Sequence, residues 1–241
     1  MTLPGGTFVE ITRGGVSWLV FEPWWERGIR HGFSMRPFDE RDAGAAHPLL
    51  REVWGAPNLF LLRQVHGSHI VEVGAGAEAS WRAGTPEGDS VLAPAPLPGG
   101  LIGVKSADCV PLLFVSGSAR AAVHAGWRGL CSPIIAETVR LLGERSGGAP
   151  LECVIGPCAG VARYEIGPEV AALLPPCARS EKRGDSLYLD LAGTAAALVR
   201  GAAGEGVMIA SSNRCTMTDS RFHSWRRDGS RAGRNLAFFA V

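Results

Sequence analysis

The chain has 241 residues, of which 46% are hydrophobic and 20% charged, and its formal net charge is +1. This length favours one domain with a core that needs no disulfide staples, and the near-neutral charge excludes a global field that would draw the protein onto nucleic acid or a membrane. With no apolar run of membrane-spanning length and no signal peptide, we expect a cytoplasmic protein whose six cysteines are reduced.

Short β-branched runs alternate with turn signals through the first half of the chain, which is typical of strands. Ser116-Gly117-Ser118 is a turn signal between two of these runs, so residues 110–115 and 119–124 are expected to form a hairpin. In chain order, the strand predictions are 18–21, 59–62, 69–73, 90–93, 101–105, 110–115, 119–124, 207–210 and 236–240.

Apolar residues at helical spacing predict four helices. These cover residues 48–54, 130–142, 169–174 and 191–203, with Gly55, Gly143 and Gly204 closing the first, second and fourth. Strands cluster early and helices come singly, without a regular βαβ alternation. The pattern therefore favours an α+β fold, with a single domain over residues 1–241 in which mixed β-sheets are flanked by helices.

A glycine-rich string at residues 74–79 follows a predicted strand and has the spacing of a dinucleotide-binding fingerprint. That fingerprint requires a helix whose N-terminus faces the pyrophosphate. Gly84 and Pro86 would stop any helix after about two turns. We therefore interpret the string as a loop and not as a cofactor site.

Three segments place a titratable side chain beside a turn at the end of a predicted strand. They are Arg63-Gln64-Val65-His66-Gly67, Ser106-Ala107-Asp108-Cys109 and His124-Ala125-Gly126-Trp127-Arg128-Gly129. Strand ends beside turns are where a fold exposes reactive groups on a rigid frame. Adjacent strands lie ~4.8 Å apart, so Cys109 and His124 can meet if the hairpin register agrees, while His66 must be brought in by the sheet.

Two chemistries fit one cysteine and two histidines. A thiolate and two imidazoles suit zinc, with one position left open for water or substrate. Alternatively, His124 could lower the pKa of Cys109 and make its thiolate a nucleophile. The competing interpretation without chemistry is a buried structural cysteine with surface histidines.

Arginines supply the candidate anion-binding groups. The turn Gly126-Trp127-Arg128-Gly129 offers free backbone N–H groups at a helix start, with Arg128 as a charged clamp, although an ordinary turn would look the same. Five arginines occur within residues 221–234, which indicates either phosphate or RNA binding or a solvated loop with internal pairs such as Arg227 with Asp228. We interpret His223 as structural and not as a fourth ligand.

Together with Ile155-Gly156-Pro157, Tyr164-Glu165-Ile166-Gly167 and Arg226-Arg227-Asp228-Gly229, these motifs strongly resemble the laccase-domain family. Its members were labelled polyphenol oxidases and are now described as purine nucleoside phosphorylases. The resemblance runs from about Gly28 to the C-terminus. It implies an α+β fold and a zinc site, with copper as the alternative metal, in which the ligands and catalytic residues are His66, Cys109 and His124.

The resemblance also implies phosphorolysis of adenosine, inosine, guanosine and methylthioadenosine, together with adenosine deamination. The expected partners are therefore a small nucleoside and phosphate, without membrane or nucleic acid. Zinc-activated water attacking the purine would explain deamination, by analogy with zinc deaminases. The candidate substrate-binding residues are Arg36, Gln64, Asp108, Arg128, Arg226 and Arg227.

The chain departs from the family pattern at two places that bear on substrate preference. Pro37-Phe38-Asp39 follows Arg36 where the family has glycines, and Arg163 stands where it has a cysteine. Three other functions remain open. They are a copper phenol oxidase, for which six histidines are few, a cysteine hydrolase that edits cell-wall precursors, and a structural zinc or RNA-binding module.

Overall fold

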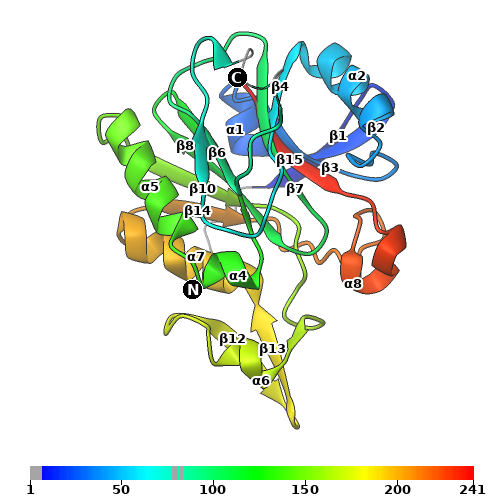
Figure 1. Ribbon diagram of the computed structural model, residues 1–241, viewed down its shortest axis with the longest axis vertical. Coiled ribbons are helices and arrows are strands. Elements are labelled where there is room, and N and C mark those ends of the chain that lie inside the picture. The colour runs from blue at the N-terminus through cyan, green and yellow to red at the C-terminus, as the bar shows by residue number, and fades with distance from the viewer. Residues whose placement is uncertain (1–6, 78–80, 82–83) are drawn as a thin grey trace.

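The computed structural model describes residues 7–77, 81 and 84–241. Two large mixed sheets and one small sheet contain all of its described strands (Figure 1). In chain order, the described elements are β1 (Phe8–Arg13), β2 (Val16–Phe21), α1 (Glu22–Glu26), β3 (His31–Ser34), α2 (Ala43–Trp54), β4 (Asn58–Leu61), β5 (Ile70–Glu72), β6 (Ser90–Ala93), β7 (Gly100–Ser106), β8 (Val110–Ser116), β9 (Ala119–Ala125), α4 (Trp127–Leu130), α5 (Ile134–Arg145), β10 (Leu151–Ile155), β11 (Glu165–Ile166), α6 (Pro168–Ala171), β12 (Arg179–Arg183), β13 (Ser186–Asp190), α7 (Leu191–Ala203), β14 (Met208–Ser211), α8 (Trp225–Asp228) and β15 (Asn235–Ala240).

The first sheet has the strand order β1-β2-β3-β15-β7-β4, and the second has the order β14-β10-β8-β9-β6-β5. Most neighbours are antiparallel, but β4 pairs with β7, β5 with β6, and β10 with β14 in parallel. The strands β11, β13 and β12 form a small sheet that projects from the body at the lower end of Figure 1. The predicted fold of mixed sheets flanked by helices is confirmed.

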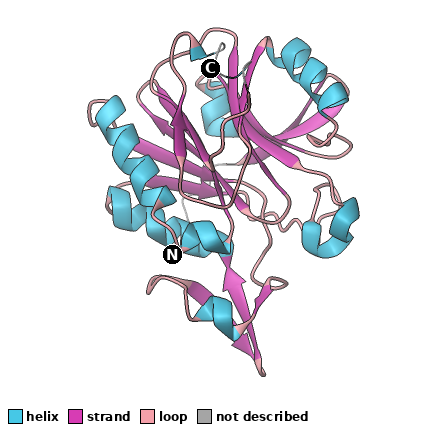
Figure 2. Cartoon of the chain, in the orientation of Figure 1, coloured by secondary structure: helices cyan, strands magenta, loops and turns pink. Residues whose placement is uncertain are grey.

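Alternating side chains build four layers. On β8, Leu112 and Phe114 pack toward the helices α5 and α7, whereas Leu113 and Val115 pack toward the first sheet. The two large sheets therefore share one apolar interface. On the outer face of the first sheet lies α2 (Figure 2), and its Leu50 packs against strand residues. Both large sheets are thus held between helices, and the loops at their strand ends are left to form a site.

The predicted helix over residues 130–142 is wrong in its bounds. The chain forms α4 (Trp127–Leu130), breaks at Pro133, and resumes as α5 (Ile134–Arg145), which passes through Gly143. Proline lacks the N–H that a continuous helix would need at this point. The break separates the short helix beside the predicted site from the helix that covers the second sheet.

The other predicted helices agree to different degrees. The bounds of α7 (Leu191–Ala203) are confirmed, but α6 (Pro168–Ala171) is shorter than predicted. Helix α2 ends before Gly55 as expected, yet it begins five residues before Pro48 because the Asp42 side chain caps its first turn. No helix in the described part of the chain is both long enough and apolar enough to cross a bilayer.

Several strands lack the sequence pattern that would have predicted them. Every residue of β12 (Arg179–Arg183) is exposed, so no apolar alternation marks it. β10 (Leu151–Ile155) was not predicted either, although it lies inside the second sheet between β8 and β14. The segment 74–79 was predicted to be a loop. Its residues 75 and 76 form a turn as expected, but Ala77 is helical, and residues 78 and 79 lie outside the described residues.

Candidate metal centre

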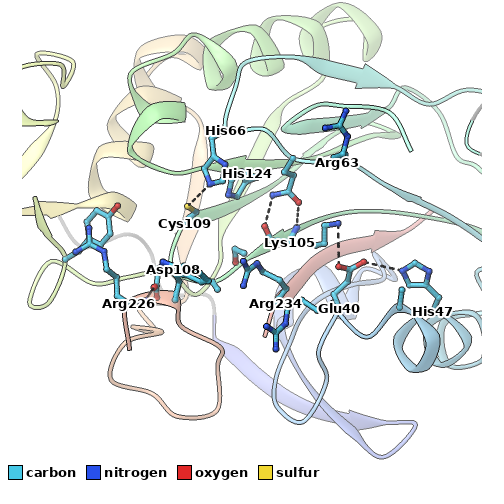
Figure 3. Close-up of a pocket in the computed structure, with 17 residues that line it drawn as sticks. Glu40, His47, Arg63, His66, Lys105, Asp108, Cys109, His124, Arg226 and Arg234 are labelled. Atoms are coloured by element: carbon cyan, nitrogen blue, oxygen red, sulfur yellow. Dashed lines mark hydrogen bonds and ion pairs between the residues drawn. The ribbon is translucent and has the colours of Figure 1, made fainter. Parts of the chain in front are cut away.

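His66, Cys109 and His124 meet at one wall of a cavity (Figure 3). Their ligand atoms all lie within 4.8 Å of one another. The Cys109 Sγ is 4.0 Å from the His66 Nε2, and the two imidazole rings have centroids 4.8 Å apart at an interplanar angle of 83°. The three segments singled out in the sequence therefore converge.

The register of the β8–β9 hairpin brings two of the three together. Val110 is paired with Ala125, and Cys109 immediately precedes that pair while His124 belongs to the next one. Gly126 provides the necessary room, since a Cβ at this position would lie 2.7 Å from the Cys109 Sγ. The glycine after the strand thus permits close approach of the backbone to the thiol.

Asp89 orients both histidines. Its buried carboxylate lies 2.9 Å from the His124 Nδ1, which turns the Nε2 of that ring toward the thiol. The same carboxylate accepts hydrogen bonds from the backbone N–H groups of His66 and Gly67, at 3.0 and 2.7 Å. These bonds hold His66 at a φ of 59°, in the left-handed region that a non-glycine residue seldom adopts. A carboxylate behind a ligand histidine is the usual outer partner in metal sites.

The cluster favours the charged forms of Cys109, His124 and Asp89. Burial would raise the pKa of the Cys109 thiol, but the adjacent His124 charge and the hydrogen bonds from both histidines outweigh burial and lower this pKa to about 6. Burial would lower the pKa of His124, but the Cys109 thiolate and Asp89 raise it to about 9. The pKa of Asp89 is lowered, because the hydrogen bonds from His124 and Gly67 outweigh its burial. The pocket therefore stabilises a thiolate, the form that binds metal or attacks an electrophile.

The cavity has a volume of about 830 Å³. Of the six residues predicted to bind substrate, Gln64, Asp108 and Arg226 line it. Arg36, Arg128 and Arg227 are not among the described lining residues. The structure thus brings all three predicted metal ligands, but only half of the predicted substrate-binding residues, to the cavity.

Gln64 and Asp108 direct their polar atoms to the protein itself. The Gln64 amide donates to the Lys105 carbonyl and accepts from its N–H, each at 2.7 Å. The Asp108 carboxylate accepts from the Thr216 hydroxyl and from the backbone N–H of Arg226, each at 2.6 Å, and its φ is 97°. Both residues shape the cavity wall. Because Asp108 directly precedes Cys109, its bond to the Arg226 N–H ties the start of α8 to the segment that carries the thiol.

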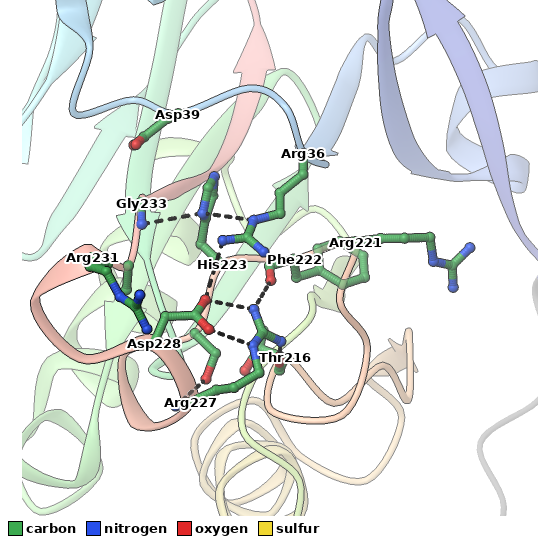
Figure 4. A network of polar contacts seen from close by, with 12 residues as sticks. Arg36, Asp39, Thr216, Arg221, Phe222, His223, Arg227, Asp228, Arg231 and Gly233 are labelled. Carbon is green, nitrogen blue, oxygen red and sulfur yellow. Dashed lines mark hydrogen bonds and ion pairs between the residues drawn. The ribbon is translucent and has the colours of Figure 1, made fainter.

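Arg227 belongs to an internal network instead of the cavity (Figure 4). Its guanidinium donates to the carbonyls of Thr216 and Phe222 at 2.6 and 2.7 Å and pairs with Asp228 at 2.8 Å. Arg36 reaches the same carboxylate at 3.2 Å. The predicted internal pair of Arg227 with Asp228 is present, and the donors of Arg227 are engaged with protein acceptors.

His223 occupies the centre of this network. Its Nε2 lies 2.8 Å from the Phe38 carbonyl, and its Nδ1 accepts from Arg36 at 3.2 Å. The expectation that His223 is structural agrees with these contacts. Arg128 lies elsewhere, with its guanidinium 4.3 Å from the ring centroid of Trp127, and remains exposed.

The sequence missed most of the cationic side of the cavity. Lys105 lies 3.5 Å from the buried Glu40, whose other oxygen is 3.2 Å from the His47 Nε2. These residues come from distant segments and carry no common motif, so no local signal could identify them. The further cationic and aromatic residues of the lining are Arg41, Arg63, Tyr164, Trp225 and Arg234.

Comparison with known proteins gives a consistent result. The profile of the family described as multi-copper polyphenol oxidoreductase laccase matches residues 32–241. A protein of Xylella fastidiosa strain 9a5c named purine nucleoside phosphorylase is 33% identical over 227 residues, covering 84% of this chain and 85% of its own. One of the same name from Deinococcus radiodurans is 34% identical over 213 residues, covering 86% and 78%. The crystal structure of YlmD from Geobacillus stearothermophilus superposes with a TM-score of 0.81 at 27% identity, covering 98% of each chain.

Proposed function

The chain belongs to the multi-copper polyphenol oxidoreductase laccase family, and we propose that it is a zinc-dependent purine nucleoside phosphorylase. The proposed substrates are adenosine, inosine, guanosine and methylthioadenosine, with adenosine deamination as a side activity. The proposal depends on one observation, which is that the His66–Cys109–His124 cluster lies on the wall of a cavity of about 830 Å³. That volume is typical of small-molecule sites. The printed names of the relatives support the substrate class.

The donor set fits zinc. One thiolate and two imidazoles are borderline-soft ligands, and three protein ligands are typical of a catalytic zinc site. Bonds of ~2.0–2.3 Å around a tetrahedral ion separate ligand atoms by about 3.5 Å, so the observed spread up to 4.8 Å would contract on binding. Zinc in this set would act as a Lewis acid and activate water at neutral pH.

The protein's own groups have separate tasks in the proposed reaction. Phosphorolysis joins a phosphate oxygen to the ribose anomeric carbon while the bond to the purine nitrogen breaks. Arg226, which lines the cavity, is the predicted arginine best placed to hold the phosphate. Lys105 and Arg234 line the same cavity and supply further positive charge. Asp89 keeps the His124 ring in one orientation.

The copper phenol oxidase alternative has less support. A blue-copper site combines two histidines and a cysteine with a weak axial ligand such as methionine. No methionine is found among the described residues that line the cavity. In the described part of the chain the three-residue cluster is the one group of this kind, whereas multicopper enzymes need several centres. An intense visible absorption from the copper-loaded protein would favour this alternative.

A cysteine hydrolase is the second candidate, because one observation favours it. Cys109, His124 and Asp89 are arranged as nucleophile, base and orienting carboxylate. The lowered pKa of the Cys109 thiol suits that chemistry as well as metal binding. Since a thiolate bound to zinc is a poor nucleophile, the two functions make opposite predictions about metal.

The test combines elemental analysis with a nucleoside assay. We expect near-stoichiometric zinc, and release of free base from inosine or adenosine only when phosphate is present. Cys109→Ala should abolish both, whereas Cys177→Ala, which changes an exposed cysteine outside the cavity lining, should leave both intact. Base release without phosphate would indicate hydrolysis. A metal-free active protein inhibited by alkylation of Cys109 would replace the phosphorylase with the cysteine hydrolase.

A further inference from the structure

Trp225 is unusual among the tryptophans of the chain. Its side chain is 49% exposed, although it lines the same cavity as the metal cluster. Trp18 and Trp24 are fully buried and Trp54 is 8% exposed, while Trp25, Trp81 and Trp127 are half-buried. An indole left open in a cavity is a surface on which a ligand can be placed.

The alternative aromatic residue in the lining is not available for this role. Tyr164 is 6% exposed, and the Arg226 guanidinium lies 4.6 Å from its ring centroid. Its pKa is raised to about 12, chiefly by burial, so the phenol stays neutral. Among the described lining residues, Trp225 is therefore the large aromatic side chain that a ligand can reach.

Hydrogen bonds hold the backbone around Trp225 in place. It is the first residue of α8, which the Ser224 side chain caps by accepting from the Arg227 N–H. The next N–H, that of Arg226, donates to Asp108 at 2.6 Å. The Arg234 guanidinium lies over the indole, 5.6 Å from its ring centroid. In Figure 3, Arg226 and Arg234 extend to either side of Asp108, which directly precedes Cys109 in the chain.

We propose that the indole of Trp225 is the stacking platform for the purine base of the substrate. This inference rests on the proposed function, and it makes Trp225 a substrate-binding residue that holds the base without touching the bond that breaks. Stacking recognises a flat aromatic ring, and every purine presents one. Trp225 should therefore bind the bases of purine nucleosides alike, without distinguishing adenosine from inosine by their different substituents.

The first test separates binding from chemistry. Removing a base-stacking aromatic side chain weakens binding on the order of ten- to hundredfold. Trp225→Ala should therefore raise the KM for inosine and for adenosine by similar factors, with kcat changed less than about twofold. Trp225→Phe, which keeps a flat ring, should restore most of the affinity. A selective loss of one nucleoside, or a loss confined to kcat, would overturn the proposal.

The second test does not depend on turnover. Titrating inosine without phosphate should quench the tryptophan fluorescence of the wild type, and Trp225→Phe should remove most of that quenching. The matched control is Trp25→Phe, since Trp25 also carries a stacked arginine, Arg30 at 4.4 Å, but lies outside the cavity lining. This control should quench like the wild type.

The outcomes distinguish the platform from the reaction. Quenching that survives in Trp225→Phe, or is missing from the wild type, overturns the platform even if phosphorolysis is found. Quenching that requires Trp225 in a protein with no phosphorolysis supports the platform and removes the proposed function. Far-ultraviolet circular dichroism and urea unfolding of each variant show whether the fold remains intact.

Discussion

Two regions of the molecule concentrate reactive side chains, and they differ in how many of these side chains face the cavity: all three of His66, Cys109 and His124 do, whereas in segment 221–234 Arg226 and Arg234 do and Arg227 does not. In the His66–Cys109–His124 cluster, the three potential ligand atoms lie within 4.8 Å of one another at a cavity wall. In the arginine-rich segment 221–234, Arg221 pairs with Asp219 and Arg227 with Asp228, so much of the charge is satisfied internally. A density of charge in the sequence therefore does not identify a binding surface. A binding surface is identified by donors and acceptors that the protein's own groups leave available.

Replacing Asp89 tests whether the cluster depends on its buried carboxylate, and it should have the largest effect. Asparagine offers one acceptor oxygen where Asp89 accepts from the loop carrying His66 and faces His124. We expect Asp89→Asn to weaken zinc affinity about 10–100-fold and to lower the free energy of unfolding by about 3 kcal/mol. Competition with a chelator and urea unfolding measure the two effects.

The matched control for that change is Asp185→Asn, because Asp185 is exposed in the turn between β12 and β13. It should leave zinc affinity and unfolding unchanged. Equal behaviour of the two variants would show that the cluster does not depend on Asp89, and the contrast between the two regions would lose its physical basis.

The pH dependence of thiol alkylation sharpens the same contrast. In chelator-treated protein the pKa of Cys109 is about 6, below its usual value, so its reactive thiolate accumulates as the pH rises through 6. Its alkylation rate should increase about tenfold from pH 5 to 7 and then level off. The largely exposed Cys131 thiol is partly desolvated, which raises its pKa, so its alkylation rate should still be increasing at pH 8. Site-resolved mass spectrometry measures both in one sample, and parallel profiles would contradict the lowered pKa.

Local patterns predicted the parts of the structure that depend on neighbouring residues. The hairpin of β8 and β9 follows from apolar runs around a turn, and it places Cys109 beside His124. The expectation that His66 approaches Cys109 and His124 came from the family resemblance, because this approach depends on contacts between residues far apart in the chain. Asp89 was missed for the same reason, since it lies 35 residues from His124 and 23 from His66. β12 was missed because all of its side chains are exposed.

Adjacent arginines give a comparison within the arginine-rich segment. Arg226→Gln should raise the KM for phosphate about tenfold with little loss of stability, because Arg226 lines the cavity and is exposed. Arg227→Gln should instead lower the free energy of unfolding by about 2 kcal/mol, because its guanidinium bonds the carbonyls of Thr216 and Phe222. Steady-state kinetics and urea unfolding of both variants separate the roles. A reversed pattern would mean that the internal network holds substrate.

Arg128 should show the smallest effect, although its motif made it a leading phosphate candidate. Its guanidinium is stacked on Trp127 and exposed, and it does not belong to the described lining of the cavity. We expect Arg128→Gln to change the KM for phosphate less than about twofold and to leave stability within about 0.5 kcal/mol of the wild type. A tenfold rise in that KM would show that phosphate binds at the start of α4. The exposed start of the helix would then contribute more to phosphate binding than the cationic lining of the cavity does.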